Sequence, residues 1–133
     1  MKNCAKAGPL VTTCFLLLYV SAPVFAGDTI TSRALIDRIE NGNAPFILDV
    51  RTPEEFARGH IPGAVNIPVS DLATRAQELM PFRNKEIVVY CEVGPRAHFV
   101  GMLMKQNGFS VVLDLQGHMY DWLANGHPIY KIY

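Results

Sequence analysis

Cysteine is scarce in this sequence, and its distribution is uneven. The 133 residues include three cysteines, two of which, Cys4 and Cys14, lie before residue 27. Cys91 is therefore the only cysteine of residues 27–133. One cysteine excludes an internal disulfide in that part of the chain, and it excludes a zinc site of the usual multi-cysteine kind. In an oxidising compartment, such an odd cysteine is a candidate reactive thiol.

An excess of charge of either sign is also missing. The chain carries 12 basic and 12 acidic residues, and residues 27–133 keep 10 basic against 12 acidic ones. This balance excludes the basic surface that nucleic acids or an acidic membrane require. The sequence has no internal repeat, no low-complexity linker and no Gly-rich nucleotide loop, and its four histidines lack close metal-ligand spacing. We therefore expect no nucleic-acid partner, no metal and no cofactor.

The first 26 residues differ from the rest of the chain. Two early lysines give a positive start, Leu10–Val20 is apolar, and Ser21–Ala26 resembles a small-residue cleavage site. This order is typical of a secretory signal peptide. A retained membrane anchor is the alternative, but the apolar run is short for a full span and Pro23 interrupts its end. We predict a cleavable signal peptide at 1–26, a single domain at 27–133 that can bury its own core, and a periplasmic or secreted location.

Apolar runs and helical patterns alternate along the predicted domain. Runs that lack polar alternation, as buried parallel strands do, predict strands at 46–50, 86–90 and 110–115, with a short one at 64–67. Start and stop signals predict the intervening helices, which begin at Thr31 or Ser32, at Pro53, at Ser70 or Asp71, after Arg96 and at Gly117. This order predicts an α/β domain with a mainly parallel central sheet and helices on both faces. Sites in such sheets form at the carboxyl ends of strands.

Particular apolar side chains are expected in the core. The helix that stops at Pro81 has an apolar stripe made of Leu72, Ala76, Leu79 and Met80. The helix after Arg96 has an apolar face made of Phe99, Val100, Leu103 and Met104. Methionine fills irregular gaps, which predicts core positions for Met102, Met104 and Met119.

The segment around Cys91 carries the strongest chemical signal. The strand Glu86–Tyr90 runs into Cys91, and a short loop with Gly94 and Pro95 leads to Arg96 and a helix. Backbone N–H groups, the positive end of the helix dipole and a guanidinium all favour an anion at such a loop. They also favour the thiolate of Cys91, which makes it a candidate nucleophile at neutral pH. The alternative is a buried cysteine that serves as a small hydrophobe.

Two separated stretches carry recognisable motifs. The first is Leu48-Asp49-Val50-Arg51 followed by Phe56–Ile67, which contains His-Ile-Pro-Gly-Ala, and the second is the Cys-x-x-x-x-Arg loop from Cys91 to Arg96. Together with Gly108-Phe109, Leu115-Gln116-Gly117 and Trp122, they resemble the rhodanese-like single-domain sulfurtransferase family from residue 30 to residue 128. Within that family, the loop looks closest to the rhodanese modules of coenzyme A disulfide or persulfide reductases.

The resemblance implies a rhodanese-like three-layer domain that transfers sulfur. Cys91 would take a sulfane sulfur from thiosulfate, a polysulfide or a low-molecular-weight persulfide, and the backbone amides of Glu92, Val93, Gly94 and Pro95 would hold the resulting persulfide. A thiol, a cyanide-like acceptor or a redox partner protein would then remove the sulfur. Related phosphatases have one residue more between cysteine and arginine, so the six-residue loop favours sulfur over phosphate.

Two other functions stay open. The first is a non-catalytic sulfur-carrier or interaction module of the same fold, which would load sulfur without turning it over. The second is a small phosphatase or arsenate reductase, against which the short loop argues. Steady-state transfer identifies the enzyme, and hydrolysis of an aryl phosphate identifies the phosphatase.

Three residues near the loop have open roles. Arg96 is a second candidate catalytic residue, which either orients an anionic donor and stabilises the loop or folds onto a nearby carboxylate. Glu92 stands where many family members have a basic or small polar residue, and it disfavours an anionic donor if it points inward. His118 replaces a second glycine after Gly117, and we expect it in an exposed turn rather than at the rim of a substrate pocket.

Four other polar residues are expected to act structurally. Asp49 and His60 belong to the first motif and are expected to hold the turns between strands. Glu54 and Glu55 look like a carboxylate pair, but acids in the first turn of a helix stabilise its positive end and explain both.

The leader yields the first testable prediction. We expect the exported protein to begin at Gly27, because the small residues before it match a signal-peptide cleavage site. N-terminal sequencing of the exported protein measures this directly. A membrane-bound protein that still begins at Met1 contradicts the prediction and identifies the segment as an anchor.

Overall fold

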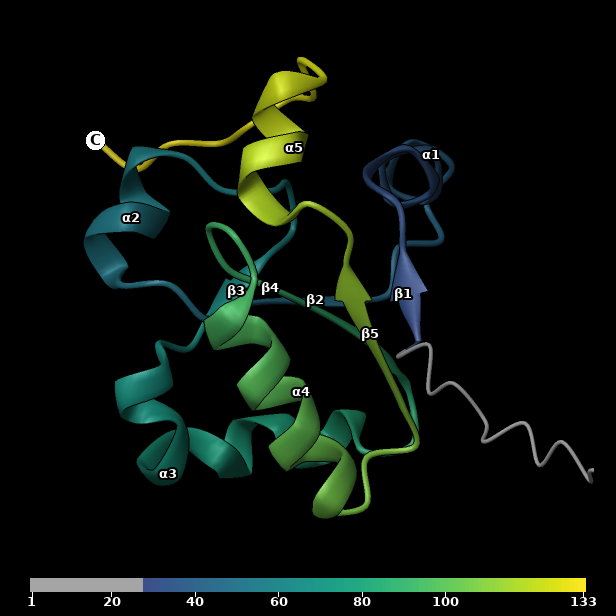
Figure 1. The fold of residues 1–133 in the computed structure, drawn as a ribbon, viewed down its shortest axis with the longest axis vertical. Helices are drawn as coiled ribbons and strands as arrows, with labels where there is room; N and C mark the ends of the chain where they lie inside the picture. Colours follow the sequence, from purple (N-terminus) through teal and green to yellow (C-terminus); the bar gives the residue numbers. More distant parts are fainter. Residues whose placement is uncertain (1–27) are drawn as a thin grey trace, which may run out of the picture.

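The computed structural model describes residues 28–133, which form one parallel sheet covered by helices (Figure 1). The sheet has five strands in the order β1-β5-β4-β2-β3, and every neighbouring pair is parallel. The strands are β1 (Thr29–Ile30), β2 (Phe46–Asp49), β3 (Val65–Asn66), β4 (Glu86–Tyr90) and β5 (Val111–Leu115). The predicted α/β class and its mainly parallel sheet are confirmed.

Side chains of the central strand β4 alternate between two apolar cores. Ile87 and Val89 join one core with residues of α4 (Pro95–Gln106), on the side of the sheet where α3 (Leu72–Arg75) also lies. Val88 and Tyr90 join the other core with residues of α1 (Ser32–Glu40) and α5 (His118–Ala124). Figure 1 shows these helix pairs on opposite sides of the sheet. A three-layer domain follows, because both faces of a parallel sheet must be covered.

The first two helices begin where their sequence signals predict. The Thr31 hydroxyl accepts the N–H of Ala34 at the start of α1. Thr52 and Glu55 form a reciprocal capping box at α2 (Pro53–Arg58), in which each side chain accepts a backbone N–H of the other residue. These bonds satisfy N–H groups that have no partner inside the helix. The capping box also fixes Glu55 at the start of α2, which becomes important at the site.

The single helix predicted from Ser70 or Asp71 to Pro81 is wrong. The chain instead forms the 3-10 helix η1 (Val69–Asp71), the short helix α3 and the 3-10 helix η2 (Ala76–Phe82). Neither predicted cap bonds a helix N–H, and Met80 is half-exposed while Leu79 is buried. Pro81 explains the change, because its ring clashes with the carbonyl four residues earlier and it has no N–H to donate.

Other burial predictions fail on α4. Phe99 and Met102 are half-exposed, whereas α4 buries a narrow stripe made of Ala97, Val100 and Met104. Residues three and four apart share a helix face, so positions 99 and 102 lie beside the stripe that contacts the sheet. The prediction of core positions for Met104 and Met119 is confirmed. Strand β1 was not predicted, because its two residues are too few to show a period.

Two predictions concern the N-terminal part of the chain. The predicted signal peptide at 1–26 and the domain boundary after it lie outside the described residues. Within residues 28–133, the structure contains no helix with the length and apolar character needed to span a bilayer.

Candidate active site

Cys91 directly follows β4, at the edge of the sheet where parallel strands end. Pairing of Asp49 with Tyr90 aligns the end of β2 with the end of β4, so their following loops meet at this edge. Cys91 is only 1% exposed and is the only free cysteine among the described residues. It packs in the same core as Ala97 and Val100 of α4. The thiol therefore has a fixed position between the sheet and the start of α4.

The loop after Cys91 turns sharply to place N–H groups near the sulfur. Gly94 has a φ of 135°, a conformation that side-chain-bearing residues rarely adopt. This turn lets the Gly94 N–H donate to Cys91 Sγ at 3.1 Å. One part of the prediction is wrong, since Pro95 has no backbone N–H and cannot belong to the ring of amide donors. Of the four residues predicted to donate, Glu92, Val93 and Gly94 have a backbone N–H.

Arg51 joins three segments around this loop. Its guanidinium donates to the buried carboxylate of Asp49 at 2.7 Å, to the Gly59 carbonyl at 2.7 Å and to the Glu92 carboxylate at 3.0 Å. Burial alone would lower the pKa of Arg51, but the hydrogen bond and charge of Asp49 raise it above its ordinary value. Arg51 therefore stays charged, and the predicted structural role of Asp49 is confirmed.

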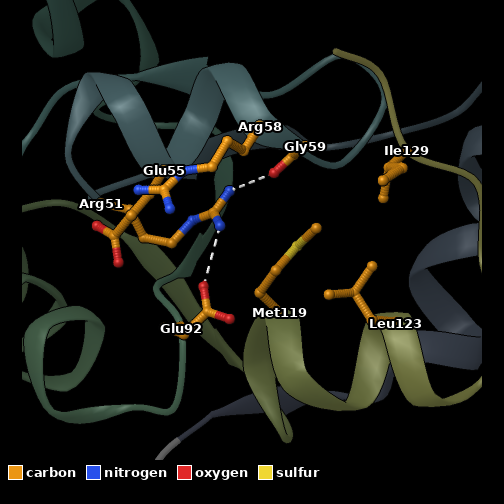
Figure 2. A pocket seen from close by; sticks show the side chains of 8 residues that line it. All are labelled: Arg51, Glu55, Arg58, Gly59, Glu92, Met119, Leu123 and Ile129. Atoms are coloured by element: carbon orange, nitrogen blue, oxygen red, sulfur yellow. Dashed lines mark hydrogen bonds and ion pairs between the residues drawn. The ribbon is translucent and has the colours of Figure 1, made fainter.

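Glu92 lies beside Cys91 in the chain but bonds to Arg51. Its side chain is partly exposed and forms part of a pocket wall (Figure 2). If Glu92 pointed inward without a partner, an unpaired carboxylate would lie next to the Cys91 sulfur. The ion pair with Arg51 instead offsets much of that negative charge.

Arg96 folds onto a carboxylate, as one of the two sequence interpretations predicts. Its guanidinium donates to both Glu55 oxygens, at 2.8 and 2.9 Å. The hydrogen bond from Arg96 is the main reason that the pKa of Glu55 falls to about 2, with a further contribution from the Thr52 N–H. The pair joins α2 to the start of α4. Arg96 can still orient an anion from there, because it is over one-third exposed.

Glu55 is the site residue that sequence reasoning missed. The sequence predicts a first-turn acid, and Glu55 has that role in the capping box, but it also binds Arg96. The available signal was the capping box itself, which directs the Glu55 side chain to a defined place. Glu54 makes no such contact, so the two acids do not form a carboxylate pair.

A pocket of about 300 Å³ lies beside the loop (Figure 2). Its lining divides into a charged group from α2 and the loops and an apolar group from the C-terminal part of the chain. The charged group is Arg51, Glu55, Arg58 and Glu92, and the apolar group is Met119, Leu123 and Ile129. Glu92 adjoins Cys91 in the chain, so a molecule in this pocket would lie next to the Cys91 loop.

The prediction of an exposed turn for His118 is wrong. Its side chain is 6% exposed, and Nδ1 accepts the backbone N–H of Cys91 at 3.3 Å. The cause is the docking of α5 on the loop, because Met119 and Tyr120 donate their N–H groups to the carbonyls of Cys91 and Glu92, each at 3.1 Å. Nor does His118 line the 300 Å³ pocket, so it contacts the loop rather than forming the pocket's wall.

The histidine of the first motif, His60, has a structural role, as predicted. His60 Nδ1 lies 2.9 Å from the Phe56 carbonyl, and the two rings are stacked.

Among residues 28–133, no three acidic, histidine or cysteine side chains cluster as a metal site requires.

Comparison with known proteins assigns the family. The chain belongs to the rhodanese-like domain family, whose model matches residues 31–125. It is 32% identical to a sulfurtransferase of Allochromatium vinosum over 77% of this chain and 94% of that protein. It is 30% identical to thiosulfate sulfurtransferase PspE of Escherichia coli over 77% of this chain and 82% of that protein. These matches relate the chain to sulfurtransferases of the rhodanese-like family.

Solved structures agree on the fold. A rhodanese-related protein of Thermoplasma volcanium superposes with a TM-score of 0.69 at 30% identity, covering 77% of this chain and 97% of that one. The Bacillus anthracis protein CoADR-RHD superposes with a TM-score of 0.65 at 28% identity, covering 77% of this chain but 18% of that longer chain. The predicted rhodanese-like fold is confirmed, and the second match agrees with the predicted likeness to a rhodanese module of a larger protein.

The Glu55–Arg96 pair leads to a prediction about stability. We expect Glu55→Gln to lower the free energy of unfolding at pH 7 by roughly 1 kcal/mol, because it removes a partly buried ion pair. The pKa of Glu55 is about 2 in the folded chain, against an ordinary 4.5, so its contribution is complete above pH 4.5 and disappears as the pH falls toward 2. Denaturant unfolding across this range measures it.

The matched control is Glu54→Gln, which removes the neighbouring first-turn acid. It should change stability far less than Glu55→Gln, although both variants remove a first-turn acid that favours the positive end of the helix. Equal losses in the two variants, or a Glu55 effect that does not vary below pH 4.5, would contradict the assigned role of the ion pair.

Proposed function

We propose that this protein is a sulfurtransferase that carries a sulfane sulfur as a persulfide on Cys91. The observation that supports this most is the Gly94 N–H directed at Cys91 Sγ at 3.1 Å, within the six-residue segment Cys91–Arg96 that leads from β4 into α4. An N–H donor aimed at sulfur favours a negative charge there, in the thiolate and in the persulfide alike. Membership of the rhodanese-like domain family supports the same chemistry.

In the first step, the Cys91 thiolate attacks the outer sulfur of the donor. With thiosulfate, a new S–S bond forms to Cys91, the bond between the two donor sulfurs breaks, and its electron pair leaves with sulfite. With a low-molecular-weight persulfide or a polysulfide, the leaving group is the thiolate or the shortened polysulfide. Cys91 then holds an anionic persulfide, close to the amide donors of the loop.

In the second step, a nucleophile attacks the outer sulfur of the persulfide. Cyanide leaves as thiocyanate and a thiol leaves as a new persulfide, and in both cases the S–S electron pair returns to Cys91. The enzyme regains its thiolate, so donor and acceptor react in alternation.

The pocket charges bear on the choice of donor. Of the two basic residues that line the pocket, Arg51 already has carboxylate partners in Asp49 and Glu92. Arg96, outside the lining, is paired with the pocket residue Glu55. A small dianion therefore gains less attraction here than the number of arginines suggests. The apolar side of the pocket favours a donor or acceptor with a carbon chain, such as a low-molecular-weight persulfide or thiol.

We also propose that the protein works in the periplasm or outside the cell. The signal-peptide pattern of residues 1–26 supports this location. The acceptor would then be an extracytoplasmic thiol or a redox partner protein.

A donor panel tests the proposed function. Incubation with thiosulfate, glutathione persulfide, coenzyme A persulfide or polysulfide should add one sulfur atom to Cys91, as read by mass spectrometry of the intact protein and its peptides. Cys91→Ser should neither load nor transfer sulfur, because an alcohol cannot form the persulfide. Transfer by Cys91→Ser at the parent's rate contradicts the proposal.

Turnover separates the proposal from its rivals. Repeated transfer to cyanide or a thiol is expected from the enzyme, and loading of one sulfur without turnover would identify a sulfur carrier instead. Hydrolysis of an aryl phosphate without sulfur loading would identify a phosphatase.

A further inference from the structure

His118 has a backbone conformation that its residue type disfavours. Its φ is 51°, and it is the only non-glycine residue with a positive φ in the described part of the chain. Glycine adopts this conformation without strain, and a histidine there persists only when its surroundings hold it. The preceding Gly117 also has a positive φ, of 68°. His118, the first residue of α5, is thus a buried histidine in a backbone conformation that glycine adopts more easily.

The contacts of the imidazole determine its protonation state. The Cys91 N–H can only donate, so His118 Nδ1 must carry a lone pair at the 3.3 Å contact. The ring is then neutral, with its proton on Nε2. Nε2 lies 3.7 Å from Asp114 Oδ1, a buried oxygen that has no hydrogen-bond partner among the described residues. The Asp114 carboxylate thus favours the tautomer that leaves Nδ1 free to accept.

The imidazole of His118 also lies near Gly94, the residue whose N–H donates to Cys91 Sγ. A methyl group placed on Gly94 would come within 3.2 Å of His118 Nε2. The imidazole therefore lies where a side chain on Gly94 would have to go, and it bonds the N–H of Cys91. One side chain thus lies beside both residues that set the distance between the sulfur and its amide donor.

We propose that neutral His118, oriented by Asp114, is a positioning residue for the Cys91 loop. It accepts the Cys91 N–H and supports Gly94, so that the Gly94 N–H stays aimed at the sulfur. This inference rests on the proposed function for its effect on rate, but not for the contact itself. His118 does not touch the donor and exchanges no proton with it.

Burial keeps His118 neutral near pH 7, against the effect of the charges around it. Burial lowers the pKa of His118, and the carboxylates of Asp114 and Asp121 only partly oppose this. Burial raises the pKa of Asp114, against Lys105 and against His118 and His98 when these are protonated. These groups lie on β5, α5 and α4, and the facing Cys91 loop carries the ionisable residues Cys91, Glu92 and Arg96.

Protonation of His118 would remove the acceptor from the loop. Because the pKa of His118 is lowered on folding, its stabilising contribution is present above pH 6.5 and is lost as the pH falls through the lower folded value. Below that pH, an N–H on Nδ1 would oppose the N–H of Cys91. The loop contact must then break.

Nitrogen-15 NMR of the protein tests the contact directly. Spectra are recorded between about pH 5 and pH 8. At neutral pH, we expect His118 to have a bare Nδ1 and a protonated Nε2. The Cys91 amide resonance should shift in step with protonation of His118. A proton on Nδ1 at neutral pH, or a Cys91 amide that does not respond to His118, overturns the proposal.

Loading rates with polysulfide at pH 7.5 test the positioning role. His118→Gly removes the acceptor and relieves the backbone, so the fold should survive while persulfide formation slows about tenfold, the effect of one hydrogen bond. His118→Asn keeps an oxygen acceptor and tolerates the positive φ, so its rate should stay within about twofold of the parent. The control His98→Asn removes an exposed histidine that also faces Asp114, and its rate should not change.

The two readouts separate this inference from the proposed function. A His118→Gly variant that loads at the parent's rate overturns the positioning role, as does an equal loss in His118→Gly and His118→Asn. If the parent protein itself fails to load sulfur, the proposed function fails, and the NMR result alone decides whether His118 holds the loop.

Discussion

The buried ion pair between Asp49 and Arg51 is the contact on which the rest of the site depends. Asp49 is fully buried at the end of β2, and the guanidinium of Arg51 continues from it to Gly59 and Glu92. A buried ion that loses its partner typically costs about 3–5 kcal/mol, so neither charge is stable there alone. Because three segments share one guanidinium, the end of β2, the end of α2 and the Cys91 loop keep a common geometry.

The Cys91 loop is held by chain segments both before and after it. Arg51 and Glu55 fix it from the N-terminal side through Glu92 and Arg96. From the C-terminal side, the first turn of α5 bonds the carbonyls of Cys91 and Glu92, and His118 accepts the Cys91 N–H. A loop bonded this thoroughly has little freedom to reorganise as charge develops on sulfur. Preorganised donors of this kind are what stabilise an anion most effectively.

Local signals in the sequence predicted the parts of this arrangement that depend on neighbouring residues. Strand runs, the helix start at Pro53 and the six-residue spacing from Cys91 to Arg96 all act within a few positions, and the structure has each of them. The contacts of Arg96 with Glu55 and of His118 with Cys91 join residues 41 and 27 positions apart. Only the packing of α2 and α5 around the loop creates them. An isolated turn histidine is usually exposed, and docking of α5 reverses that expectation.

In the proposed mechanism, the outer sulfur of a Cys91 persulfide lies within the amide donors of this loop. A crystal structure of the protein after treatment with polysulfide, with anomalous scattering used to locate sulfur, tests it most directly. We expect a second sulfur bonded to Cys91 Sγ, within hydrogen-bond distance of loop N–H groups, and a loop that has not moved. A persulfide that turns away from these amides, or a loop that rearranges to hold it, would contradict this mechanism.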